Sequence, residues 1–185
     1  MFSEKAKATE QQSASLVARP DAVESVVATG AYTVECVGAD GQVKWSETIK
    51  NLVVTVGKNA MLDEFFAGSA YTAAWYLGLV DGASSPTYNA ADTMGSHAGW
   101  SEFTSYSEST RPAPTWSSAS AGSKATTATS FSISGTGTVA GAFMTTDSTK
   151  SGTTGTLYSA GNFTGGSRSV ASGDTLNVTY TATLT

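Results

Sequence analysis

The stretch IKNLVVTVGKNAMLDEFFAGSAYTAAWYLGLVDG, residues 49–82, is the most apolar part of the chain and decides the fold. It begins with an extended apolar run at 52–56 and continues with a short amphipathic segment at 58–66. Gly68 closes that segment, as glycine often does at the C-terminus of a helix. The run at 75–80 is apolar on both parities, which is typical of a strand buried on both faces. We therefore predict a strand–helix–strand unit as the core, with the remaining sheets wrapped on it.

Apolar residues of the helical segment repeat four positions apart, so that they share one face of the helix. Met61 and Phe65 form one such pair. We expect Leu62 and Phe65 to be buried against the strand that carries Leu77 and Leu79.

The composition indicates one domain of the all-β class. A chain of 185 residues has the length of a single domain and can bury a core without disulfide or metal staples. Charged residues make up only 14%, against about 25% in typical proteins, and small residues take their place. The net charge of −5 and the lack of a Lys/Arg cluster argue against a nucleic-acid partner. Cys36 is the only cysteine, which excludes an intrachain disulfide.

Residues 1–28 differ from the sandwich domain predicted at 29–185, because they hold much of the charge and few apolar side chains. Pro20 would break a continuous helix, so we predict an extended or mobile arm, with a short helix at 21–27 as the alternative. We expect the arm to become ordered on a partner and to be dispensable for folding. The N-terminal residues lack the apolar core of a secretory signal, and no run is apolar enough to span a membrane, so no membrane partner is expected.

Alternating apolar and polar residues, with frequent turns, predict a β-sandwich for the rest of the chain. A hairpin is expected at 30–49 with its turn at Ala39-Asp40-Gly41, and a last strand at 176–184. A weak helical turn is expected at 90–99, and an edge strand at 111–116, where two prolines disfavour helix. The predicted fold is an all-β, antiparallel, jelly-roll-like β-sandwich with one short helix packed on it and an N-terminal arm.

Several residues could carry chemistry, but each has a simpler interpretation. His97, the only histidine, could act as a general base, yet the chain has no G-x-S-x-G nucleophile motif, which favours a loop or packing role. Zinc needs several His or Cys ligands, and the chain holds one of each. Asp63, Glu64 and Asp92 are candidate acids, with Asp63 and Glu64 expected on the wet face of the helix. We therefore predict no enzyme activity, no catalytic or metal-binding residues and no cofactor.

Aromatic residues in the middle of the chain suggest a binding surface. Trp100, Tyr106 and Trp116 could line a site on which a sugar ring stacks. Aromatic residues of a β protein more often belong to the core. Both interpretations stay open on the sequence.

A family resemblance is carried by eight short segments: MFSEK at 1–5, YTVEC at 32–36, IKNLVVTVGKN at 49–59, YLGLV at 76–80, ADTM at 91–94, HAGW at 97–100, LYSAG at 157–161 and SGDTLNVTY at 172–180. On these segments the chain resembles a family of virion structural proteins from tailed bacteriophages. The resemblance covers nearly the whole chain except roughly 9–29, which looks like an insertion.

The resemblance implies a non-enzymatic component of the phage particle and gives no catalytic residues. We expect a capsid decoration, or cement, protein located in the virion. Its expected partners are the major capsid protein or other virion proteins, and further copies of itself in a homo-oligomer. The alternative is a tail- or fibre-associated component, or a glycan-binding module at the virion surface.

Overall fold

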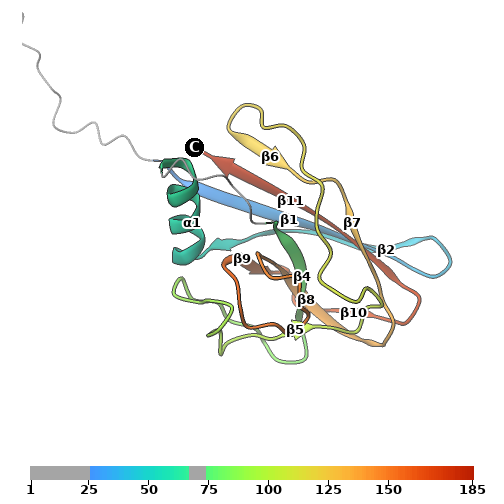
Figure 1. Ribbon diagram of the computed structural model, residues 1–185. Coiled ribbons are helices and arrows are strands. Elements are labelled where there is room, and N and C mark those ends of the chain that lie inside the picture. Colours follow the sequence, from blue (N-terminus) through green and yellow to red (C-terminus); the bar gives the residue numbers. More distant parts are fainter. Residues whose placement is uncertain (1–25, 67–73) are drawn as a thin grey trace, which may run out of the picture.

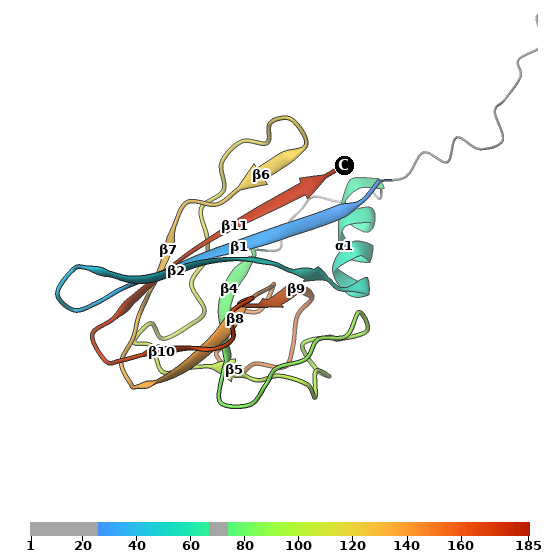
Figure 2. The ribbon, with the colours of Figure 1, turned by 180° about the vertical axis from the view of Figure 1, so that it is seen from behind.

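Two antiparallel sheets pack together in the computed structural model, which describes residues 26–66 and 74–185. One short helix lies beside one end of the first sheet (Figure 1), and the view from behind shows the same arrangement (Figure 2). This confirms the predicted all-β sandwich with one short helix.

The first sheet has the order β2-β1-β11, and β6 and β7 both pair with the remaining edge of β11. These strands are β1 (Ala28–Val37), β2 (Val43–Lys50), β6 (Ser123–Ala125), β7 (Thr129–Ser132) and β11 (Thr175–Leu184). β1 and β2 form the predicted hairpin, and Gly41 in its turn has the positive φ of 77° that glycine tolerates. The alternation of β11 is also confirmed, since Leu176, Val178 and Tyr180 are fully buried.

The second sheet has the order β3-β9-β8-β4-β5, with β10 also paired to β8. Its strands are β3 (Leu52–Val53), β4 (Tyr76–Asp81), β5 (Glu102–Phe103), β8 (Gly137–Thr145), β9 (Leu157–Asn162) and β10 (Arg168–Val170). β9 and β10 follow one another along the same edge of β8, so they form one interrupted strand.

The second sheet is covered on both faces, which explains why 75–80 is apolar on both parities. Leu77 and Leu79 belong to the main core, between the sheets. Val80 and Phe143 of β8 belong to a second cluster on the other face, which Met94 and Trp100 from the segment after β4 complete. The main core therefore lies between the sheets, and the strand–helix–strand unit is only one part of its lining.

Two glycines of the second sheet lie where neighbouring atoms leave no room for a side chain. A side chain at Gly141 of β8 would collide with the carbonyl oxygen of Gly161 on β9. A side chain at Gly78 of β4 would collide with the ring of Phe143, which lies over that position.

The helix, α1 (Thr55–Phe66), begins three residues before the predicted start and packs elsewhere than predicted. It contacts β9, where Gly57 lies against the backbone of Tyr158 and the Tyr158 hydroxyl lies 3.2 Å from the sulfur of Met61. Leu62 is 55% exposed, so the prediction that it is buried against β4 is wrong. The prediction for the Phe65 side chain lies outside the described part.

Two further predictions of secondary structure are wrong. No helical turn forms at 90–99, where short turns and a single bridge occur instead. No strand forms at 111–116, where the one ladder contact is the bridge between Trp116 and Thr126. Both segments are loops that are held by backbone as well as side-chain hydrogen bonds.

The predicted arm lies outside the described residues except for its last three. Val27 exchanges two backbone hydrogen bonds with Thr185, and Ala28 already belongs to β1. The sandwich therefore begins slightly before the predicted boundary at residue 29.

Candidate functional site

A buried ion pair between Arg111 and Glu102 is at the centre of a polar cluster. Their side chains are 1% and 6% exposed. Nε and Nη2 of Arg111 donate to the two carboxylate oxygens of Glu102 at 3.0 and 2.8 Å, which is the bidentate geometry that suits this pair. Glu102 lies on β5, whereas Arg111 lies nine residues later in a loop, so the pair ties this loop back to the strand.

The loop at 146–156 closes over this ion pair. Arg111 donates to the carbonyl oxygens of Asp147 at 2.9 Å and Gly152 at 3.1 Å, and Glu102 accepts the Ser151 amide at 2.6 Å. Ser151 has a φ of 55°, a backbone conformation that side chains disfavour and that the surrounding contacts hold in place. We call Glu102, Arg111 and this loop the Arg111 clasp.

Lys150 extends the clasp toward Tyr106. Its ammonium group donates to the Tyr106 carbonyl oxygen at 2.6 Å and lies 3.7 Å from the centre of the Tyr106 ring. The Tyr106 hydroxyl donates to Glu102 at 3.3 Å. Burial, together with the negative charge of Glu102, raises the pKa of Tyr106 well above its usual range, so this phenol stays protonated.

The polar groups of the clasp are engaged with one another. Among the described residues, only Trp45 Nε1 and Asn51 Oδ1 are buried side-chain atoms without a hydrogen-bond partner, and neither belongs to the clasp. The hydrogen bonds of Arg111 and Glu102 thus fix the loop at 146–156 against β5.

A cavity of about 230 Å³ lies beside the clasp, and it includes the only histidine. The His97 ring stacks on Trp100 at 4.0 Å between ring centres, and its Nδ1 lies 3.0 Å from the Trp100 carbonyl oxygen. Asp92 accepts the indole N–H of Trp100 at 3.2 Å and the Asn89 amide at 3.0 Å. His97 and Asp92 thus both hold Trp100 in place, which is the packing role that the sequence favours.

The candidate residues for a sugar-binding surface do not form one. Trp100 and Tyr106 are 5% and 2% exposed, so neither offers a face to a ligand. Trp116 is half-buried and lies edge-on to Tyr180, 6.2 Å away, with Lys124 over its ring. Asp63 and Glu64 are exposed on α1, as predicted.

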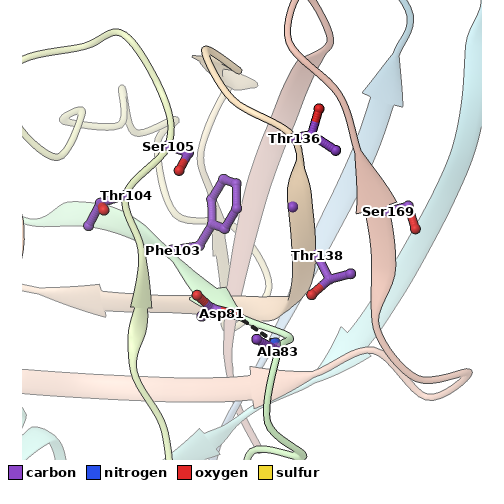
Figure 3. Close-up of a pocket in the computed structure, with 9 residues that line it drawn as sticks. Asp81, Ala83, Phe103, Thr104, Ser105, Thr136, Thr138 and Ser169 are labelled. Carbon is purple, nitrogen blue, oxygen red and sulfur yellow. Dashed lines mark hydrogen bonds between the residues drawn. The ribbon is translucent and has the colours of Figure 1, made fainter.

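A shallow depression of about 430 Å³ lies where β5, β8 and β10 meet (Figure 3). The Phe103 ring forms part of its wall and packs on Gly137. The depression has one carboxylate, that of Asp81, which accepts the Ala83 amide at 2.7 Å. Hydroxyl groups supply the rest of its polar lining, from Thr104, Ser105, Thr136, Thr138 and Ser169. One carboxylate among hydroxyl groups can bind polar ligands but does not form an acid–base pair.

Another buried carboxylate, which the sequence did not reveal, lies immediately before β11. Asp174 is 4% exposed and accepts hydrogen bonds from Lys44 at 2.6 Å and from the Ala171 amide at 2.9 Å. Burial alone would raise the pKa of this carboxyl group, but these two donors outweigh it and hold the pKa below its ordinary 3.8. Burial and the Asp174 carboxylate also raise the pKa of Cys36 to about 11, so that this thiol is protonated and unreactive at neutral pH.

The lowered pKa of Asp174 predicts a pH-dependent contribution to stability. A carboxylate with a depressed folded-state pKa stabilises the fold above its ordinary pKa, and this contribution is lost as pH falls through the folded-state value. We expect Asp174→Asn to lower the free energy of unfolding at pH 7, and the difference from wild type to shrink below pH 3.8. Urea unfolding across this pH range measures it, with Asp63→Asn as an exposed control. A difference that is constant with pH would contradict the assignment.

Comparisons with known proteins add no family: no protein-family model and no curated protein matches the chain. Residues 26–66 and 74–185 contain no group of three or more His, Cys, Asp or Glu side chains placed to hold a metal ion. Across the same described residues, no helix has both the length and the apolar character needed to cross a membrane.

Proposed function

We propose that the chain is a non-enzymatic structural protein of a tailed-phage virion, and specifically a capsid decoration protein that binds the assembled particle. The observation that carries the proposal is the Arg111 clasp, where a buried ion pair fixes surface loops of the sandwich in one arrangement. The family resemblance of the eight sequence segments supports the same role.

A decoration protein acts through binding alone. A protein that binds the assembled lattice and not its unfolded subunits stabilises the lattice by mass action, by about 2.7 kcal/mol when its free concentration is a hundred times the dissociation constant. Tight binding to the lattice is favoured by a rigid surface with ordered loops, because loops that become ordered only on binding reduce the affinity. The clasp supplies such order in the described loops.

The location of the protein in the particle tests the proposal. We expect labelled protein to lie on the outside of the head, with a copy number comparable to that of the major capsid protein. Particles that lack it should lose their contents at a lower temperature than complete particles. A location restricted to the tail or neck would reject decoration and leave a structural role elsewhere.

Deletion of residues 1–25 tests the predicted arm. The cut lies before Val26, because Val27 and Ala28 are already bonded to the end of β11. We expect the melting temperature to stay within a few degrees of the full chain, since the two sheets remain complete, and binding to particles to weaken. An unfolded truncated chain would make the arm part of the core, and unchanged binding would remove its role in attachment.

A second candidate function is a glycan-binding module, favoured by the hydroxyl-lined depression of Figure 3. Its hydroxyl groups and the Asp81 carboxylate can bind the hydroxyl groups of a sugar, and the Phe103 ring offers an apolar contact. If this function holds, a glycan array will give a signal that Asp81→Asn abolishes and Asp63→Asn does not. Signals that are absent, or equal in the two variants, would reject it.

A further inference from the structure

Two Asp-Gly dipeptides occur in the chain, Asp40-Gly41 and Asp81-Gly82. This dipeptide can rearrange chemically, because the backbone nitrogen of the glycine can attack the side-chain carboxyl carbon of the aspartate. Glycine has no side chain to hinder the attack, and it gives the backbone the freedom that ring closure needs. The structure places the two dipeptides in different surroundings, since one lies in a turn and the other at the end of β4.

The first dipeptide, Asp40-Gly41, lies in the turn between β1 and β2. Residues 39–42 are all exposed, and the turn projects beyond the second sheet in both views (Figures 1 and 2). The hydrogen bonds of the turn are local. The Gly41 amide donates to the Gly38 carbonyl oxygen at 2.9 Å, and the Gln42 amide donates to the preceding aspartate side chain at 3.0 Å. Local hydrogen bonds in an exposed turn open at a low cost in free energy.

Long-range contacts hold the second dipeptide, Asp81-Gly82. The Asp81 amide donates to the Ser101 carbonyl oxygen at 2.9 Å. The Gly82 amide donates to the Thr138 carbonyl oxygen, also at 2.9 Å, and Asp81 pairs with Val139 in the ladder between β4 and β8. Freeing the Gly82 nitrogen requires the end of β4 to separate from β8, which costs more free energy than opening an exposed turn.

We propose that Asp40-Gly41 is a self-modification site, at which Asp40 converts to isoaspartate in the folded protein. The Gly41 nitrogen forms a bond to the side-chain carboxyl carbon of Asp40 and loses its proton, and one carboxyl oxygen leaves as water. Water then hydrolyses the resulting succinimide ring. Hydrolysis at the main-chain carbonyl carbon breaks its bond to the Gly41 nitrogen and leaves the chain running through the former side chain. One water leaves and one enters, so no other reactant is needed.

The conversion changes the turn and leaves the rest of the hairpin in place. Isoaspartate lengthens the main chain by one methylene group and frees the former main-chain carbonyl as a carboxylate. The turn is closed by the Gly38 amide, which donates to the Gln42 carbonyl oxygen at 2.8 Å, and a longer chain disturbs this closure. Beyond the turn, Lys44 is anchored to Asp174 at 2.6 Å, so we expect the disturbance to stay local.

Methylation by a protein-isoaspartate methyltransferase with a labelled methyl donor detects the free carboxylate. Trypsin places the two dipeptides on different peptides, residues 8–44 and 59–124, because Arg19 and Arg111 each precede a proline and are not cleaved. After storage of the folded full chain, we expect the peptide 8–44 to carry about tenfold more label than 59–124. After storage in urea, the two peptides should carry similar label, because the fold no longer distinguishes the two dipeptides.

Two matched variants complete the test. Asp40→Glu keeps the charge but has a longer side chain that closes the ring far more slowly, so the label on 8–44 should disappear. Asp81→Glu should leave that label unchanged. Equal label on the two peptides of the folded protein would overturn the proposal. So would a label on 8–44 that persists in Asp40→Glu, or one that arises in urea and not in the folded chain.

Discussion

Replacing Arg111 by methionine is expected to lower the free energy of unfolding by about 3–5 kcal/mol, because it leaves the buried Glu102 carboxylate without its counter-charge. Arg111 is 1% exposed and Glu102 is 6% exposed, so water cannot replace the lost contacts without opening the loop. The same change removes the donors to the carbonyl oxygens of Asp147 and Gly152. Urea unfolding gives the loss, and amide exchange at Ser151 shows whether the loop opens.

A second ion pair provides a matched control. Arg168 pairs with Glu47, but the two side chains are 28% and 21% exposed. Arg168→Met should therefore cost only about 0–1 kcal/mol, as is usual for ion pairs in contact with water. Equal losses for the two arginine variants would show that burial does not set the strength of the Arg111 clasp.

Removing both charges of the clasp gives a sharper measurement. In the double variant Arg111→Met/Glu102→Leu no unpaired charge remains, although Tyr106 and the Ser151 amide lose their acceptor. We expect the double variant to lose less stability than the sum of the two single losses. Strict additivity would mean that the two side chains act independently.

The sequence correctly predicted a hairpin and single strands, because alternation and turn residues are local patterns. The β1–β2 hairpin follows from alternation and a glycine at the turn, and β11 follows from alternation alone. The apolar run at 75–80 correctly predicted a strand covered on both faces.

Predictions failed where long-range contacts decide the structure. α1 lies at the end of the sandwich and packs against β9, so only part of its apolar stripe is covered and Leu62 stays exposed. Periodicity predicts an apolar face but does not predict what covers it. The segment at 111–116 has the sequence pattern of an edge strand. Its first residue, Arg111, is instead bonded to Glu102 and to the carbonyl oxygen of Gly152, and the local pattern does not predict these contacts.

For the candidate sites, too, the sequence predicted what depends on local residues and missed what depends on long-range contacts. His97 was correctly expected to have a packing role, because its lone occurrence gave no set of ligands or nucleophile partners. The Arg111 clasp had no signal in the sequence, since Glu102, Arg111 and Ser151 come together only through the fold. The burial of Trp100 and Tyr106 was the alternative that the composition favoured.

Phe143→Ala is expected to cost about 3–5 kcal/mol, the range for truncation of a buried phenylalanine. Phe143 is fully buried on β8 and belongs to the second apolar cluster. Its ring centre lies 5.0 Å from that of Trp100 and 5.2 Å from the Arg111 guanidinium carbon. The ring also fills the space over Gly78, where no side chain is present to collapse into the cavity.

Phe143→Ala tests whether the outer face of the second sheet and the segment carrying Trp100 enclose a second hydrophobic core. Leu62→Ala is the control, because Leu62 is 55% exposed and its truncation should cost within about 0.5 kcal/mol, as for most surface changes. Both losses are measured by urea unfolding, with the slope of free energy against urea concentration as a check that the folded states are comparable. A loss below about 1 kcal/mol for Phe143→Ala would mean that the segment carrying Trp100 only rests on the sheet. A loss of about 3–5 kcal/mol would show that the segment carrying Trp100 and the outer face of the second sheet enclose a second core.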